Sequence, residues 1–134
     1  MTARAHVLVV DDDEAVRRSY SAILAGGQCD AQMATDGAEA LAAMEHQPFD
    51  LVLLDLTMPG PDGISVLRTL KQRWPESEVI VITGYPSVES AKEAVRLGAF
   101  EYLAKPAWPD DIVAAARGAL NHKQFALRQK MANS

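Results

Sequence analysis

The sequence predicts a single doubly wound α/β domain, in which a five-stranded parallel sheet is covered by helices on both faces. Two observations support this fold class. The chain has 134 residues, 49% of them hydrophobic, which suffices for one compact unit with its own core. Short apolar runs rich in branched residues alternate with longer segments of helical period, a pattern typical of a parallel sheet buried on both faces.

The apolar runs are the expected strands. They cover Val7–Val10, Cys29–Ala34, Leu51–Leu54, Val79–Thr83 and Phe100–Ala104. Only the run at 29–34 lacks continuous apolar side chains. Since a central strand of a parallel sheet is buried on both faces, this run predicts an edge strand.

Segments of helical period separate these runs. They cover Glu14–Ala25, Gly37–His46, Ile64–Trp74, Ser87–Leu97 and a last helix that starts at Pro109. We expect Gly26-Gly27 and Gly98 to provide left-handed C-caps and Pro75 to stop the third helix. Pro109 suits the first position of a helix because its φ is already fixed.

The end of the chain turns polar but keeps Phe125, Leu127 and Met131. We therefore expect a domain over residues 1–121 and a helical extension or connector over residues 122–134. A frayed helix end and a segment that pairs with its twin in a dimer are both open at this point.

Charge and cysteine content exclude several classes of function. Thirteen Lys and Arg against eighteen Asp and Glu give a net charge of −5, which disfavours direct binding to nucleic acid or to an anionic membrane. One cysteine, Cys29, cannot form an internal disulfide. The apolar run that ends at Val10 is too short for a signal peptide or a membrane span. We expect a cytoplasmic protein, with the histidines as plain surface residues; these are His6, His46 and His122.

Polar residues gather where the expected strands end. Asp11-Asp12-Asp13 follow the first strand, Asp55 the third, and Lys105 the fifth, while Thr83 ends the fourth. Ligands of open parallel sheets bind beyond this edge. Crowded carboxylates need a cation, and Mg²⁺ prefers oxygen ligands, so the cluster with an opposing lysine suits phosphoryl transfer. Taken alone, Asp13 is better explained as a helix N-cap or a solvated carboxylate.

Four longer segments share these strand ends. They are VLVVDDDEAVRR at Val7–Arg18, DLVLLDLTMPGPDG at Asp50–Gly63, VIVITGY at Val79–Tyr85, and GAFEYLAKP at Gly98–Pro106. In this order they resemble the response-regulator receiver domain of two-component signalling, a member of the CheY-like superfamily. The resemblance extends from about Ala5 to about Leu120. With five strand–helix units we expect the strand order 2-1-3-4-5 of flavodoxin-like folds.

The resemblance implies a role for each acidic residue at the site. It makes Asp55 the phosphoryl acceptor, and Asp11 and Asp12 the acidic pair that holds Mg²⁺. In the family, the acceptor carboxylate and the backbone carbonyl two residues later, here Thr57, also meet the ion. An aspartate that accepts a phosphoryl group forms an acyl phosphate.

The resemblance also implies how phosphorylation is sensed. Thr83 and Lys105 correspond to the hydroxyl and the ammonium that bond phosphoryl oxygens. Tyr102 corresponds to the switch aromatic that moves inward on activation. Pro106 corresponds to a proline whose peptide bond with the preceding lysine is cis, which would aim Lys105 into the site.

The sequence departs from the family pattern after Lys105-Pro106. The family usually has an aromatic residue there, whereas this chain has Ala107 followed by Trp108. We expect Trp108 to take over the packing, the alternative being an exposed anchor for a partner. Thr57 and Tyr85 occupy positions that vary in the family and flank the phosphoryl group, so they should set the dephosphorylation rate.

Two other function classes compete. Haloacid-dehalogenase-like phosphatases have an Asp-x-Asp motif after an apolar strand, which would make Asp11 the nucleophile and Asp13 the acid/base. Ala15 stands where that motif has Thr or Val, and the chain has no room for the usual cap domain. A pseudo-receiver that binds partners without phosphorylation is disfavoured because no residue of the site is missing.

The sequence therefore predicts a signalling switch and not an enzyme, apart from its own phosphorylation and slow dephosphorylation. The resemblance implies that a sensor histidine kinase or a phosphotransfer protein is the donor. Activation would change the surface formed by the fourth helix, fifth strand and fifth helix, with a possible homodimer. The segments Thr83–Tyr85 and Val88–Leu97 most resemble receivers of enhancer-binding transcription regulators. We expect the N-terminal part of such a regulator or a stand-alone receiver.

Overall fold

The computed structural model describes residues 4–57 and 63–133 of the chain. Strands and helices alternate along it, and residues 58–62 of the second motif lie outside the described part. In order, the elements are β1 (Ala5–Val10), α1 (Glu14–Gly26), β2 (Cys29–Ala34), α2 (Gly37–His46), β3 (Leu51–Asp55), α3 (Gly63–Arg73), β4 (Glu78–Thr83), α4 (Val88–Arg96), β5 (Glu101–Ala104) and α5 (Pro109–Ala132). Every expected element is present, and its bounds either match the prediction, as for β2 and α2, or differ by at most two residues.

The strands form one parallel sheet in the order β2-β1-β3-β4-β5, as predicted. All residues of β3 and β4 are buried, which explains their continuous apolar runs. The predicted edge position of β2 is confirmed. The other edge strand, β5, is short and only half buried. Its edge position was not predicted, because its residues are mostly aromatic and apolar.

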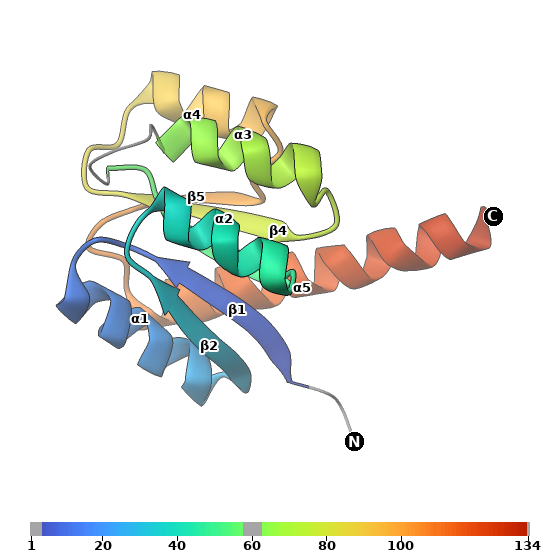
Figure 1. The fold of residues 1–134 in the computed structure, drawn as a ribbon, viewed down its shortest axis with the longest axis horizontal. Coiled ribbons are helices and arrows are strands. Elements are labelled where there is room, and N and C mark those ends of the chain that lie inside the picture. Colours follow the sequence, from blue (N-terminus) through green and yellow to red (C-terminus); the bar gives the residue numbers. More distant parts are fainter. Residues whose placement is uncertain (1–3, 58–62, 134) are drawn as a thin grey trace.

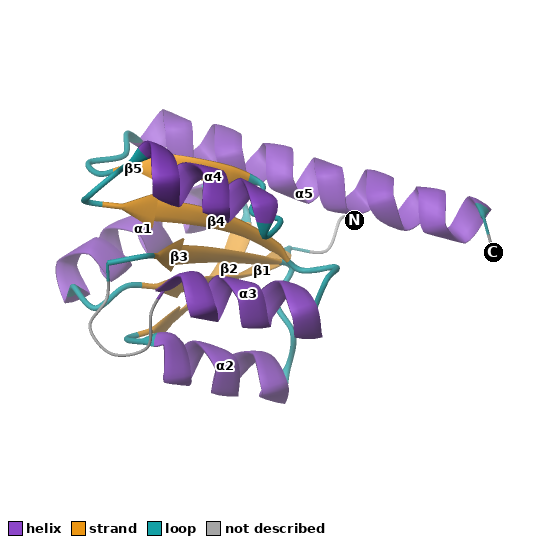
Figure 2. Cartoon of the chain, turned by 90° about the horizontal axis from the view of Figure 1, so that it is seen from above, coloured by secondary structure: helices purple, strands orange, loops and turns teal. Residues whose placement is uncertain are grey.

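Helices cover both faces of the sheet and so create two cores (Figure 1). Leu8 and Val10 of β1 face α2, α3 and α4, and pack with Met44 and Leu67. Val7 and Val9 point to the opposite face, where α1 and α5 lie. This alternation along one strand is the two-residue period of β structure. Figure 2 shows the sheet between the two helical layers.

Helix ends follow the predicted signals with one exception. Asp13, Asp36 and Ser87 accept hydrogen bonds as N-caps of α1, α2 and α4. Gly98 has a φ of 102°, as expected for a left-handed cap. The predicted left-handed cap at Gly26-Gly27 is wrong, because the positive φ, 67°, belongs to Gln28.

Backbone hydrogen bonds explain this shift. The amides of Gly27 and Gln28 bond to carbonyls three residues earlier, Leu24 and Ala25, so the last turn of α1 tightens before the chain reverses.

The fifth helix runs 24 residues, to Ala132, and its second half extends beyond the sheet (Figure 2). Three side chains of this half reach back to the domain. The Nζ of Lys123 lies 3.5 Å from Oδ1 of Asp50, and the Nζ of Lys130 lies 2.9 Å from Oε1 of Glu76. His122 is an exposed surface residue, as predicted, and its Nδ1 lies 3.2 Å from Oε1 of the buried Glu78.

None of the helices in the described parts of the chain is long and apolar enough to cross a membrane.

Candidate functional site

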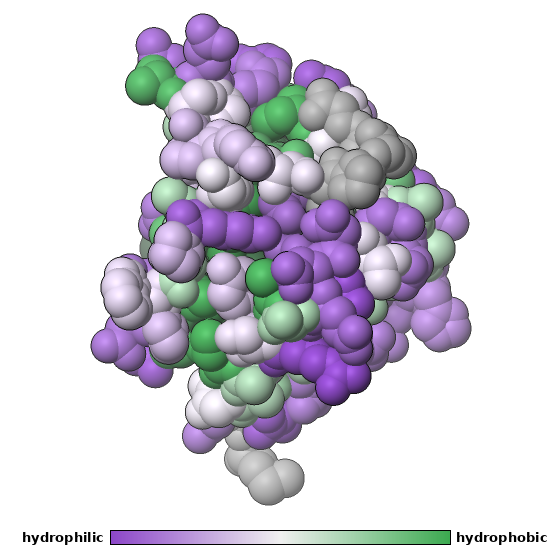
Figure 3. Space-filling model, turned by 90° about the vertical axis from the view of Figure 1, so that its left-hand side faces the viewer, coloured by the Kyte–Doolittle hydropathy of each residue, from purple (hydrophilic) through white to green (hydrophobic). Residues whose placement is uncertain are grey.

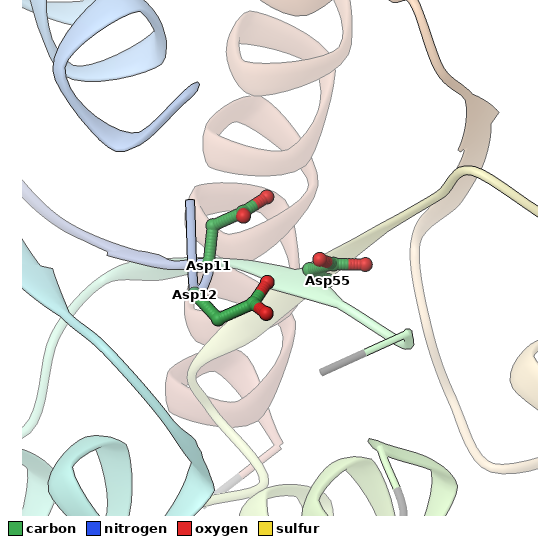
Figure 4. Close-up of side chains that lie close together, drawn as sticks. All are labelled: Asp11, Asp12 and Asp55. Atoms are coloured by element: carbon green, nitrogen blue, oxygen red, sulfur yellow. The ribbon is translucent and has the colours of Figure 1, made fainter. Parts of the chain in front are cut away.

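The site lies at the edge where the parallel strands end. Figure 3 views this face and shows hydrophilic side chains gathered on it. Asp11 directly follows β1, and Asp55 is the last residue of β3, the neighbouring strand. Carboxylate oxygens of Asp11, Asp12 and Asp55 lie within 4.8 Å of one another (Figure 4). The topology therefore brings together the acidic residues that the sequence analysis singled out.

Burial divides these three carboxylates. Asp11 and Asp55 are each only 2% exposed, whereas Asp12 is exposed. Burial raises the pKa of the Asp11 carboxyl above its ordinary value, although hydrogen bonds from Lys105 and from the amide of Asp13 oppose the shift. Two buried acids next to each other thus depend on a nearby positive charge.

Lys105 supplies that charge from the end of β5. Its Nζ donates to Oδ2 of Asp11 at 2.8 Å and to Oδ2 of Asp55 at 3.1 Å. The predicted cis peptide bond between Lys105 and Pro106 is present. Burial lowers the pKa of Lys105, but the hydrogen bonds to the two carboxylates outweigh it and the pKa lies above the ordinary value. Lys105 is therefore a charged bridge between the two acids.

Thr57 contacts the other oxygen of the Asp55 carboxylate. Oδ1 of Asp55 accepts hydrogen bonds from the amide of Thr57 at 2.9 Å and from the hydroxyl of Thr57 at 2.7 Å. The sequence analysis assigned only the carbonyl of Thr57 and missed this hydroxyl contact. Thr57 lies two residues after Asp55, and at this spacing Ser and Thr hydroxyls reach nearby backbone and side-chain groups, so the sequence did contain a signal for the contact.

Arg17 is a second residue that the sequence analysis missed. Its guanidinium donates to the backbone carbonyl of Asp11 at 2.8 Å. Arg17 lies one turn into α1, four residues after the N-cap Asp13, so the helix itself presents the side chain to the loop. The contact fixes the backbone from which Asp11 and Asp12 project.

Thr83, the last residue of β4, is buried, with 1% of its surface exposed. Its Oγ1 accepts a hydrogen bond from the amide of Tyr85 at 3.0 Å. A threonine hydroxyl keeps its proton free when it accepts. The Thr83 hydroxyl can therefore donate to a further acceptor without losing the hydrogen bond from the Tyr85 amide.

Comparison with known proteins identifies this arrangement. The sequence model of the response regulator receiver domain matches residues 7–117. The chain belongs to the response regulator receiver domain family. Its members are phosphate-accepting switches of two-component systems, so the phosphatase alternative is not favoured.

Relatives of this receiver domain are whole transcription regulators and single domains. The DNA-binding transcriptional regulator NtrC of Escherichia coli K12 is 39% identical over 121 residues, which are 90% of this chain and 26% of that protein. The chain thus spans about a quarter of the length of this relative.

Solved structures agree with the fold. The crystal structure of a CheY-like receiver domain protein from Methanospirillum hungatei JF-1 has a TM-score of 0.88 at 29% identity, and covers 92% of this chain and 98% of that one. The solution structure of the beryllofluoride-activated NtrC4 receiver domain dimer has a TM-score of 0.84 at 36% identity, and covers 88% of this chain and 98% of that one.

Asp13 of the receiver domain has the structural role that was predicted for it. Its Oδ1 accepts from the amide of Val16 at 3.2 Å as the N-cap of α1. A side chain engaged in this way is not placed to serve as an acid/base beside Asp11, which is a further argument against an Asp-x-Asp phosphatase.

The predicted packing of Trp108 is wrong. The side chain of Trp108 is 72% exposed, and Ala107 packs against the core on the face of α1 and α5. The extended backbone of Trp108 at the N-cap of α5 turns its side chain outward after Ala107 has taken the inner position. The small side chain of Ala107 is therefore the substitute for the family's aromatic residue.

Tyr102 of the receiver domain is half buried, and its hydroxyl contacts the start of α4. It accepts from the amide of Ser87 at 3.2 Å and lies within hydrogen-bond distance of the Ser90 hydroxyl. The sequence analysis did not predict these two partners.

Proposed function

We propose that Asp55 accepts a phosphoryl group from a phosphohistidine. A carboxylate oxygen of Asp55 attacks the phosphorus, the bond from phosphorus to the imidazole nitrogen breaks with its electron pair going to that nitrogen, and an acyl phosphate forms. The observation that supports this most is the Lys105 bridge to Asp55 and Asp11, because it places a positive charge where the phosphoryl oxygens would arrive.

Thr83 and Lys105 would then contact the phosphoryl oxygens. The Thr83 hydroxyl has a proton to donate, and the Lys105 ammonium already donates a hydrogen bond to the Asp55 carboxylate. Both contacts become stronger when Asp55 carries a phosphoryl group. Such differential contacts are what allows a ligand to shift a conformational equilibrium.

We also propose that Asp11, Asp12, Asp55 and the carbonyl of Thr57 hold Mg²⁺. The donor set fits, because three carboxylates face one ammonium and leave a net negative charge that a divalent ion compensates. The ion supplies charge neutralisation, which lets an anionic donor approach. Arg17 would hold the loop that presents Asp11 and Asp12.

The donor that we propose is a sensor histidine kinase or a phosphotransfer protein. NtrC is a DNA-binding transcriptional regulator of which this chain matches 26%, so we propose that the chain is the N-terminal receiver part of such a regulator. We propose that the receiver itself contacts no nucleic acid, which its net charge of −5 supports. The cytoplasmic location stays a prediction.

We propose that activation moves Tyr102 inward and changes the surface of α4, β5 and α5, with dimer formation. Val88 and Val95 of α4 are exposed apolar residues on this surface, which supports a partner there. The NtrC4 receiver, a relative at 36% identity, is a dimer in its beryllofluoride-activated form.

Intact-mass analysis tests the proposed phosphorylation. Wild type and Asp55→Asn are treated with acetyl phosphate, each with Mg²⁺ or with a chelator. We expect one added phosphoryl group in wild type with Mg²⁺ and none in the other three samples. Equal labelling of Asp55→Asn would refute the assignment of Asp55, and equal labelling without Mg²⁺ would refute the role of the ion.

A further inference from the structure

Ser87, Ser90 and Tyr102, here called the hydroxyl cluster, tie β5 to the first turn of α4. The amide of Ser87 donates to the Tyr102 hydroxyl, which also lies within hydrogen-bond distance of the Ser90 hydroxyl. The hydroxyls of Ser87 and Ser90 lie 3.0 Å apart. The Tyr102 side chain is thereby fixed at its outer end, while its ring packs against the core between the sheet and α4.

A short loop connects this cluster to Thr83. The amide of Tyr85 donates to the Thr83 hydroxyl, and Ser87 follows only two residues later. The loop between them is exposed, with Tyr85 at 82%, so little packing resists its movement. A shift of Thr83 toward Asp55 would therefore pull the loop that supplies the Ser87 amide to Tyr102.

We propose that Ser90 is a positioning residue of the switch, whose hydroxyl holds Tyr102 against α4 and opposes activation. The inference rests on the proposed function, in which Tyr102 moves inward when Asp55 is phosphorylated. In this proposal, the inward movement separates the Tyr102 hydroxyl from Ser90 and from the Ser87 amide, the two groups that it contacts in this structure. The free energy of these contacts is therefore part of what phosphorylation has to overcome.

Ser90 can be tested without disturbing the helix. Ser87 is unsuitable because its side chain also caps α4, accepting from the Ser90 amide at 3.0 Å. Ser90 lies inside the first turn, and alanine is the better helix former at such a position. Ser90→Ala therefore leaves the cap of α4 in place. It also removes the contacts of the Ser90 hydroxyl with the hydroxyl and the carbonyl of Ser87, at 3.0 and 3.3 Å, so the combination with Tyr102→Phe is needed to assign the effect to Tyr102.

The test is a titration with beryllofluoride, which mimics a phosphoryl group on a carboxylate, in the presence of Mg²⁺. The full chain is followed by NMR through the amide signals of Tyr85 and Val88. Loss of one hydrogen bond corresponds to about twofold to tenfold in an equilibrium constant. We expect Ser90→Ala and Tyr102→Phe each to lower the half-saturating beryllofluoride concentration by about that factor.

Three further variants assign the effect to this contact. The double variant should respond no more strongly than Tyr102→Phe alone, because both substitutions remove the same interaction. Ser90→Thr, which keeps a hydroxyl, should stay near wild type. Ser19→Ala, at an exposed position of α1, is the matched control and should leave the titration unchanged.

Two results would overturn the proposal. An unchanged titration for Ser90→Ala, or effects of Ser90→Ala and Tyr102→Phe that add fully, would show that Ser90 does not position Tyr102. If acetyl phosphate labels Asp55 in the same variants without beryllofluoride, only the positioning role of Ser90 fails. If wild type takes up no phosphoryl group on Asp55, the proposed function fails and the role of Ser90 fails with it.

Discussion

Three consecutive aspartates at the end of β1 have three different environments. Asp11 is buried and bonded to Lys105, Asp12 is exposed within reach of Asp55, and Asp13 caps α1. The order of the residues predicted that an acidic cluster would form there. The N-cap role of Asp13 was also predicted, but the burial of Asp11 beside an exposed Asp12 depends on how the chain turns from the strand into the helix, and this came from the three-dimensional structure.

The difference between Asp12 and Asp13 leads to a direct test of the magnesium site. Ion binding to the folded state raises the free energy of unfolding, by about 2.7 kcal/mol when Mg²⁺ is 100 times its dissociation constant. We expect Asp12→Asn to lose most of this gain. Asp13→Asn is the matched control, since Asn caps helices as well as Asp does.

Thermal unfolding with and without Mg²⁺ measures both variants. A magnesium-dependent gain that survives in Asp12→Asn but disappears in Asp13→Asn would mean that the two residues are assigned the wrong way round.

Cys29 gives a prediction for pH. Burial raises the pKa of its thiol above the ordinary value, with help from Asp30 and Asp50 and against Arg4. The folded protein therefore has less thiolate at a given pH than the unfolded chain. The stability that this difference contributes is fully present below the ordinary thiol pKa and is lost as pH rises above it, through the raised pKa of the folded protein. Thiol labelling at pH 8 should be slow for the folded protein and fast in denaturant; equally fast labelling of both would contradict the buried position.

At the scale of elements, the entry into α3 depends on a glycine. A Cβ on Gly63 would lie 2.7 Å from the backbone of Leu56, which directly follows β3. We expect Gly63→Ala to lower the free energy of unfolding by about 1–3 kcal/mol, because backbone cannot move aside as a side chain can.

Gly26 is the matched control for this substitution. A Cβ on Gly26, in the last turn of α1, has nothing within 4 Å. Gly26→Ala should be neutral or stabilising by about 0.5 kcal/mol, since alanine loses less backbone entropy. Denaturant unfolding compares the two variants, and equal effects would show that the contact with Leu56 is not what restricts position 63.

Most elements could be predicted from the sequence because their signals are local. Apolar runs identified the strands, and Pro109 marked where the last helix starts. The errors concern neighbours distant in sequence or fine turn geometry. The exposure of Trp108 depends on how Ala107 fills the core beside α1, and the positive φ of Gln28 depends on the tightened end of α1.

At the scale of the molecule, the second half of α5 differs in charge from the rest. The chain carries −5 overall, yet it has no Asp or Glu after Asp111. Lys123 and Lys130 lie against acidic residues at the edge of the sheet opposite the site. Of these two pairs, only Lys130–Glu76 is exposed, and such pairs contribute little to stability, whereas the Lys123 side chain is largely buried. The boundary predicted at residue 121 stays a prediction, since the helix continues through it.

Sedimentation tests whether this half of α5 pairs with its twin. We expect beryllofluoride and Mg²⁺ to convert the full chain from monomer to dimer, and removal of residues 122–134 to weaken the dimer, because Phe125 and Met131 are exposed apolar residues there. Both the full chain and the shortened chain are measured with and without beryllofluoride and Mg²⁺. A monomer in all four samples would refute the dimer and favour the frayed helix end as the explanation of this segment.

The parallel arrangement of the strands explains why the residues of the site could be predicted from the sequence. Parallel strands end at one edge, so residues far apart in the sequence, such as Asp11, Asp55 and Lys105, had to meet there. The contacts of Tyr102 with α4 could not be predicted, because they depend on where a helix lies relative to the sheet and not on a strand end.

Mapping the phosphoryl group to one residue tests directly whether Asp55 is the acceptor. The phosphorylated chain is reduced with borohydride, which converts an aspartyl phosphate into homoserine, and the peptides are sequenced by tandem mass spectrometry. We predict homoserine at position 55 and unmodified aspartate at positions 11 to 13. Homoserine at position 11 with an unmodified Asp55 would contradict the account and favour the phosphatase-like alternative.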